Sequence, residues 1–144
     1  ALNLTTQTQL AAMLPITATY SLVGGTRPTD ELGRVGDLTA ISANLNFATQ
    51  KITDYTLSAN NSGRTWDARG SGTFGQFLSS NDGLRLNGLC TGCTTDASGN
   101  AITSSANGFA KGALVGSQAQ GLITTYGLQA NEKGISGAAV LKRP

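Results

Sequence analysis

The chain has 144 residues and a formal net charge of +2, and its charged residues make up 12%, about half the usual share of roughly 25%. It contains no histidine, which argues against histidine-dependent hydrolysis and ordinary zinc catalysis, because histidine is the commonest general base and metal ligand. The 10 basic residues are scattered singly and form no stripe that would neutralise phosphates, so we expect no nucleic-acid partner.

Residues 1–15 are predicted to form a lead-in segment, either a short helix or an irregular stretch. Leu4, Leu10 and Leu14 fall within about three helical turns, and Pro15 ends the segment. The chain begins at Ala1 without an initiator methionine, so we expect a mature form or an excised domain. No apolar run approaches the roughly 20 residues that cross a bilayer, so we expect no transmembrane segment.

From residue 16 onward the apolar side chains alternate with polar ones, which is typical of strands with one buried face. The predicted inward residues of the first strands are Ala18, Tyr20 and Leu22, then Ile41, Ala43, Leu45 and Phe47, then Tyr55, Leu57 and Ala59, then Trp66, Ala68 and Gly70, and then Leu84 and Leu86. The turn at residues 60–63 predicts a hairpin between the third and fourth strands. Three more strands are predicted over residues 109–115, 122–128 and 135–141, which gives about eight in all.

Short strands with polar turns and no helical crossover predict an all-β fold. Glycines in the last strands favour closure, so we expect an eight-stranded antiparallel up-and-down β-barrel over residues 16–144. These glycines are Gly108, Gly112, Gly121, Gly127 and Gly137. Thr, Ser, Asn and Lys on the second face of the strands argue against an outer-membrane barrel, whose exterior is apolar.

The interior of an eight-stranded barrel is just wide enough for side chains or for one small ligand. We expect side chains to fill it, because the predicted inward residues include several aromatics: Tyr20, Phe47, Tyr55, Trp66, Phe74 and Tyr126. A true cavity is the alternative.

The two cysteines, Cys90 and Cys93, lie in a stretch rich in Gly, Thr and Ser. We expect them to form a disulfide that closes a small surface loop, which suits an oxidising compartment. A redox motif would need a βαβ pattern that is missing here, and a zinc site would need four ligands. Free thiols are the remaining alternative.

The densest acidic cluster contains Asp30, Glu31 and Asp37, which we interpret as a turn cap and solvated charges rather than a catalytic pair. Asp96 and Asn100 lie in a loop that loosely resembles the start of a calcium site, but no bidentate glutamate follows, so we predict an Asx turn. We therefore expect no metal and no cofactor.

The C-terminal third carries Gly-rich and Gly-Ala-Ala stretches at residues 112–119, 121–122 and 135–140. These resemble the last strands of the transferrin-binding-protein-B-like β-barrel superfamily, with Val115 standing where an aromatic is usual. Residues 18–26 and 28–30 resemble the barrel modules at the C-terminus of some bacterial FecR-type domain proteins. The resemblance covers residues 16–144.

This resemblance implies a bacterial barrel in the periplasm or at the cell surface that binds or scaffolds, and it implies nothing catalytic. The predicted function is therefore a non-enzymatic extracytoplasmic module that binds another protein or is an accessory domain of a larger protein. The alternative is a lipocalin-like carrier of a small apolar ligand, and the sequence leaves the oligomeric state open. The longest predicted loops, residues 24–37 and 89–107, would contact a partner. Their candidate residues are Thr26, Arg27, Asp30, Glu31, Arg34, Thr91 and Thr94.

Overall fold

A computed structural model describes residues 17–79, 83–116 and 119–143. The elements in chain order are β1 (Thr17–Gly25), β2 (Thr29–Asp30), β3 (Asp37–Asn46), β4 (Lys51–Asn61), β5 (Arg64–Thr73), the π-helical turn η1 (Gly75–Ser79), β6 (Leu84–Thr95), β7 (Ala101–Val115), β8 (Gly121–Ala130) and β9 (Lys133–Lys142). No helix among these residues is long and apolar enough to cross a membrane. The lead-in predicted for residues 1–15 lies outside the described part of the chain.

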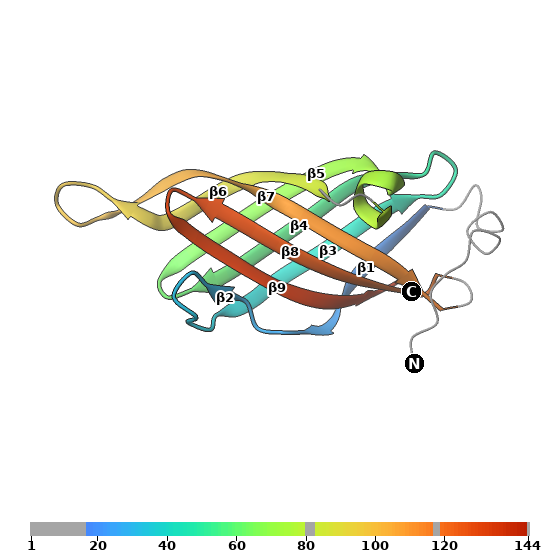
Figure 1. Cartoon of the computed structure of the whole chain (residues 1–144), viewed down its shortest axis with the longest axis horizontal. Helices are drawn as coiled ribbons and strands as arrows, with labels where there is room; N and C mark the ends of the chain where they lie inside the picture. Colours follow the sequence, from blue (N-terminus) through green and yellow to red (C-terminus); the bar gives the residue numbers. More distant parts are fainter. Residues whose placement is uncertain (1–16, 80–82, 117–118, 144) are drawn as a thin grey trace.

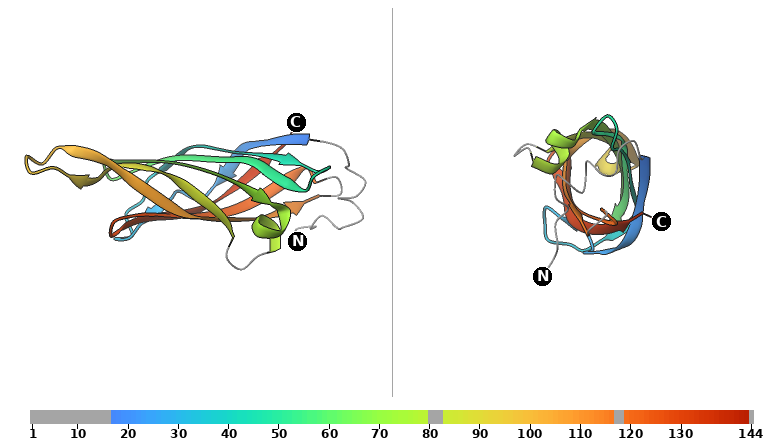
Figure 2. Two further views of the ribbon diagram at one scale, coloured as in Figure 1. Left: turned by 90° about the horizontal axis from the view of Figure 1, so that it is seen from above. Right: turned by 90° about the vertical axis from the view of Figure 1, so that its right-hand side faces the viewer.

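The described strands form one antiparallel sheet in the order β1-β3-β4-β5-β6-β7-β8-β9, and pairing of β1 with β9 closes it into a barrel. Each strand of the barrel lies beside its neighbours in sequence, and the closed ring is visible end-on in Figure 2. This confirms the predicted eight-stranded up-and-down barrel. The sequence did not predict the short strand β2. Its residues Thr29 and Asp30 pair with Ser136 and Ile135 near the start of β9.

Aromatic side chains fill the barrel interior, as predicted. Tyr20, Tyr55 and Trp66 are fully buried, and Phe47, Phe74 and Tyr126 are at most 7% exposed. The turn η1 adds Phe77, whose ring lies edge-on to Tyr55 at a centroid distance of 5.6 Å. Burying such large side chains in a closed barrel is the main source of its stability.

The first strand departs from the predicted alternation at its C-terminal end. Ser21 is the last residue of β1 that pairs with β3, and a bulge between Leu22 and Gly24 interrupts the pairing of β1 with β9. Leu22 comes before this bulge and pairs with the buried Leu141, yet it is 38% exposed, so its predicted burial is wrong.

β6 and β7 extend beyond the barrel as a two-stranded ribbon, which projects at the left of Figure 1. We call residues 92–105 the arm. The predicted loop at residues 89–107 is therefore mostly strand, and the connection is only the turn between Thr95 and Ala101. The predicted start of the next strand at residue 109 is also wrong, because β7 begins at Ala101.

The disulfide between Cys90 and Cys93 is present, as predicted, but it lies within β6 rather than in a surface loop. Both half-cystines belong to the buried core, with Cys90 0% and Cys93 4% exposed. The register of β6 against β7 shifts between Thr91 and Thr94, and Gly92 has a φ of 95°. The disulfide thus spans a bulge at the base of the arm.

Glycines in the last strands were predicted to mark close approach of backbone, and Gly108 does so, whereas a Cβ atom on Gly127 would make only ordinary contact. A Cβ atom on Gly108 would overlap the carbonyl oxygen of Gly127 on β8. A Cβ atom on Gly24 of β1 would meet no other atom within 4 Å, and Gly24 has no positive φ. Of Gly108 and Gly24, only Gly108 is therefore required by the packing.

We predict that Gly108→Ala lowers the free energy of unfolding by about 1–3 kcal/mol, because the added methyl group must push two backbones apart. Gly24→Ala is the matched control and is expected to leave stability unchanged or slightly higher. Urea denaturation of both variants measures the difference. Equal midpoints for the two variants would contradict the close approach.

We also predict that Cys90 and Cys93 resist alkylation by iodoacetamide in the unreduced, denatured chain and react after reduction. Replacing both by serine should cost about 2 kcal/mol of stability, the loop-closure term for so short a loop. Mass spectrometry and urea denaturation provide the two measurements. Alkylation without reduction would overturn the disulfide.

Candidate binding groove on the outer face

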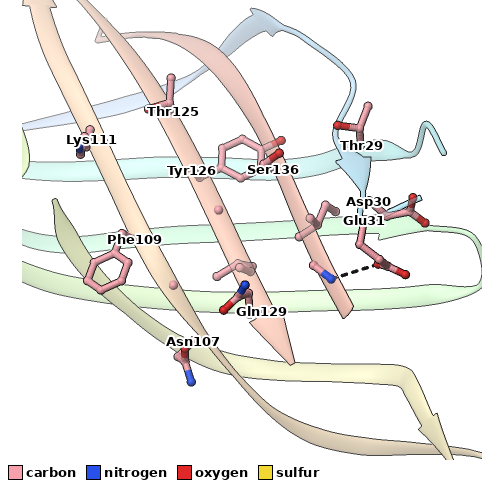
Figure 3. A pocket seen from close by; sticks show the side chains of 15 residues that line it. Thr29, Asp30, Glu31, Asn107, Phe109, Lys111, Thr125, Tyr126, Gln129 and Ser136 are labelled. Atoms are coloured by element: carbon pink, nitrogen blue, oxygen red, sulfur yellow. Dashed lines mark hydrogen bonds between the residues drawn. The ribbon is translucent and has the colours of Figure 1, made fainter. Parts of the chain in front are cut away.

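A groove of about 660 Å³ lies on the outer face of the barrel, across β7, β8 and β9. The segment around β2 forms its far wall (Figure 3). Outward-facing side chains of the three strands line it: Asn107, Phe109, Lys111, Thr125, Gln129 and Ser136. The volume falls in the range of roughly 300–1,000 Å³ that is usual for binding sites.

The groove exists because side chains of very different size stand in one row across the sheet. Phe109 pairs with Gly127, and Gly127 pairs with Ser136. Gly127 has no side chain, so the row has a large wall, a bare backbone floor and a small opposite wall. Phe109 is 44% exposed, an unusual position for a phenylalanine on a strand of the barrel.

Two cations stand beside Phe109. The Arg85 guanidinium on the adjacent strand β6 lies 5.5 Å from the Phe109 ring centroid, within range of a cation–π interaction. Lys111 faces outward two residues further along β7 and lines the groove. Neither cation forms an ion pair within the described part of the chain. This end of the groove is therefore basic and partly aromatic.

The far wall is held in place by Glu31. Its carboxylate accepts hydrogen bonds from the Arg64 guanidinium at 2.8 Å and from the Gly134 N–H at 3.1 Å. The residue therefore ties the β2 segment to β5 and to the start of β9 at once. The same two donors lower the pKa of Glu31 to about 2, so the group is an anion at neutral pH.

Asp30 is turned away from solvent, with a side chain that is 0% exposed. Removal from water alone would raise the pKa of Asp30, but hydrogen bonds from the Arg34 N–H, the Arg34 guanidinium and the Leu32 N–H outweigh this and lower it. The guanidinium bond measures 2.7 Å. Asp30 thus closes a tight turn, which agrees with its predicted role as a turn cap.

The loop that carries these residues is also anchored to the end of β4. The Asn61 amide donates to the Arg34 carbonyl oxygen at 2.9 Å and to the Pro28 carbonyl oxygen at 3.3 Å. Because Asn61 is 1% exposed, these bonds lie inside the molecule. The wall of the groove is consequently a fixed part of the barrel.

The other predicted partner-binding residues are spread over two regions. Thr26 bonds with the backbone of Ala138, and Arg27 bonds with Asp37 at 3.1 Å in an exposed pair. Thr91 pairs with a threonine of β7 through its hydroxyl, and the Thr94 hydroxyl is buried without a partner in the described structure. Of the seven predicted residues, only Asp30 and Glu31 line the groove. Partner contacts by the seven stay a prediction.

The sequence interpretation missed Phe109 and Lys111, although a signal for them was present. Ala106, Ala110 and Leu114 are the inward residues of β7, so the even-numbered positions face the core. Phe109 and Lys111 have the opposite parity. An aromatic residue that shares the parity of a lysine is a sign of an exposed ring.

The acidic cluster does not assemble into a catalytic pair within the described residues. Asp30 and Glu31 are each held by an arginine, and Asp37 bonds with Arg27. Asp96 forms the predicted Asx turn, accepting the Asn100 N–H at 2.9 Å. No group of three metal-ligating His, Cys, Asp or Glu residues converges in the described ranges.

Comparison with known proteins finds no family model that matches the chain and no curated protein that matches it. Among solved structures, a mutant of the vaccine antigen transferrin-binding protein B from Haemophilus parasuis is similar at 10% identity and a TM-score of 0.38. The match covers 90% of this chain and 26% of that protein, so the chain spans about a quarter of it. At that TM-score the likeness carries no argument about function, and the link to FecR-type proteins stays a prediction.

The ion network predicts a stability that falls in acid. The lowered pKa values of Asp30 and Glu31 mean that the unfolded chain binds protons more readily, so their contribution is complete above about pH 4.5. It is lost as the pH falls toward 2. Thermal unfolding between pH 6 and pH 2 measures the trend, and Glu31→Gln should flatten it. An unchanged slope in that variant would contradict the role of Glu31.

Proposed function

We propose that the chain is a non-enzymatic extracytoplasmic module that binds another protein through the outer groove, as an independent binder or as an accessory domain of a larger bacterial protein. The observation that carries this proposal is the row of Phe109, Gly127 and Ser136, which sets an exposed aromatic ring beside a bare backbone floor. Exposed aromatics next to arginine are typical of the centre of protein interfaces.

The filled interior favours this function over the lipocalin-like alternative. A carrier needs space inside the barrel for its ligand. Tyr20, Phe47 and Trp66 occupy that space, and none of them is more than 1% exposed. The groove that faces outward is therefore the better candidate for recognition.

The state of the carboxylates favours binding over catalysis. A general acid or base works best when its pKa lies near the working pH. In the groove wall the pKa of Glu31 is instead lowered to about 2, and the pKa of Asp30 is also lowered. Both groups act as fixed anions that hold the loop.

An extracytoplasmic location is supported by the disulfide between Cys90 and Cys93, because disulfides persist in oxidising compartments. The bond is buried at the base of the arm, as a structural disulfide would be. The assignment to bacteria rests on the sequence resemblance.

Site-specific photocrosslinking tests the proposal. We expect benzoylphenylalanine at position 109 to form a covalent adduct with a protein partner in cells that naturally produce the chain. Position 140 is the matched control, because Val140 is 43% exposed on the outer face of β9 and does not line the groove. Adducts at both positions, or at neither, would contradict a binding groove at Phe109.

A further inference from the structure

β7 is longer than the strand that pairs with it in the barrel. Its pairing with β8 begins at Asn107, so residues 101–106 have a neighbour, β6, on one side only. The other side is an open strand edge along the arm (Figure 1). An open edge presents unpaired N–H and C=O groups that pair readily with another chain.

This edge lacks the usual protection against pairing. Proteins block open edges with charges, prolines or bulges. Between Arg85 and Lys111 the sequence contains a single charged residue, Asp96, and no proline. The bulge at the base of the arm belongs to β6 and leaves β7 regular.

The orientation of the free backbone groups follows from two contacts. The Lys111 carbonyl oxygen accepts the Thr124 hydroxyl of β8 at 2.8 Å, so it lies on the β8 side of β7. Ser104 has the opposite parity and directs its hydroxyl to the Cys90 carbonyl oxygen of β6. Because successive residues alternate, Thr103 and Ser105 direct their N–H and C=O groups to the open side.

The open edge leads directly into the groove. Asn107 and Gln129 form the first residue pair of β7 with β8, and both line the groove. A strand added to the edge would therefore end at the mouth of the groove, near Asn107. Beyond that point stand Phe109 and the two cations, Arg85 and Lys111.

We propose that the open edge of β7 binds an extended segment of a partner protein by strand addition, and that an acidic residue next to this segment enters the groove beside Lys111. The inference rests on the proposed function, since it names the kind of partner segment that the groove receives. Backbone hydrogen bonds to Thr103 and Ser105 provide the affinity, and the groove selects the sequence.

Charge selects an acidic segment over a basic one. Lys111 and Arg85 form no ion pair among the described residues, whereas the anion on the opposite wall, Glu31, is already paired with Arg64. An arriving carboxylate therefore meets uncompensated positive charge beside an aromatic ring.

The test uses a synthetic peptide of alternating valine and threonine with glutamate at both ends, so that either strand direction is allowed. A matched peptide carries lysine at both ends. We expect the glutamate peptide to bind the full chain and the lysine peptide to bind at least about tenfold more weakly. Fluorescence anisotropy measures the affinities, and hydrogen exchange should slow at the Thr103 and Ser105 amides but not at Ser104.

Two variants separate strand addition from other modes of binding. Ser105→Pro removes an N–H that faces the open edge, where proline is tolerated, and should weaken the glutamate peptide about fivefold. Ser105→Ala keeps the N–H and should bind like the unmodified chain. Lys111→Gln leaves Arg85 as the one cation beside Phe109 in the described part of the chain, so it should reduce the preference for glutamate over lysine without changing the thermal unfolding midpoint.

Each other outcome overturns the inference. Equal affinities of the two Ser105 variants, or no binding of either peptide, would exclude strand addition at this edge. Dimers of the chain that dissociate on Ser105→Pro in sedimentation would show that the edge pairs with a second copy instead. If neither peptide binds but the crosslink at position 109 still forms, only this inference is overturned. If the peptides do not bind and no crosslink forms at position 109, the proposed function is overturned as well.

Discussion

The pairing of β1 with β9 is the constraint on which the rest of the structure depends, because it closes the sheet. In a closed sheet every side chain points either into the barrel or out of it. The inward positions are committed to a core built around Tyr20, Tyr55 and Trp66. Function is consequently left to the outward positions and to the strand segments that extend beyond the ring.

Both candidate features arise from that division. The groove is a depression in the outer surface, where Gly127 has no side chain to cover the backbone between Phe109 and Ser136. The arm forms because β6 and β7 extend beyond the residues that pair with β5 and β8. The outward side chains of both features lie outside the core, so they can vary in sequence without unfolding the barrel.

Much of the fold was predictable because burial leaves a period of two in the sequence. Tyr55 and Trp66 lie on the adjacent strands β4 and β5, which a tight turn joins, and both are fully buried as predicted. The arm gave no such signal, because both of its faces are polar or weakly apolar and its strands are held by backbone hydrogen bonds that any residue can make. Leu22 is exposed although it has the parity of the buried Tyr20, so the period of two predicted its burial wrongly.

The candidate site was less predictable than the fold, for a related reason. Asp30 and Glu31 were predicted to contact a partner because they are charged loop residues. In the structure they hold the groove wall in place by bonding with Arg34, Arg64 and Gly134. The partners of Glu31 are distant in sequence, so no local pattern reveals them, whereas Asp30 bonds with Arg34 only four residues away, in line with its predicted turn cap. Phe109 was detectable in principle from its parity, but only once the inward register of β7 was known.

The rigidity of the surroundings gives the groove and the open edge their value for binding. The disulfide between Cys90 and Cys93 holds the base of the arm within the core, and Asp96 closes its tip with bonds to the Ser98 and Asn100 N–H groups. An edge that is already extended loses little conformational entropy when a strand is added to it. The cost of ordering then falls on the incoming segment, so affinity will depend on how readily that segment adopts an extended conformation.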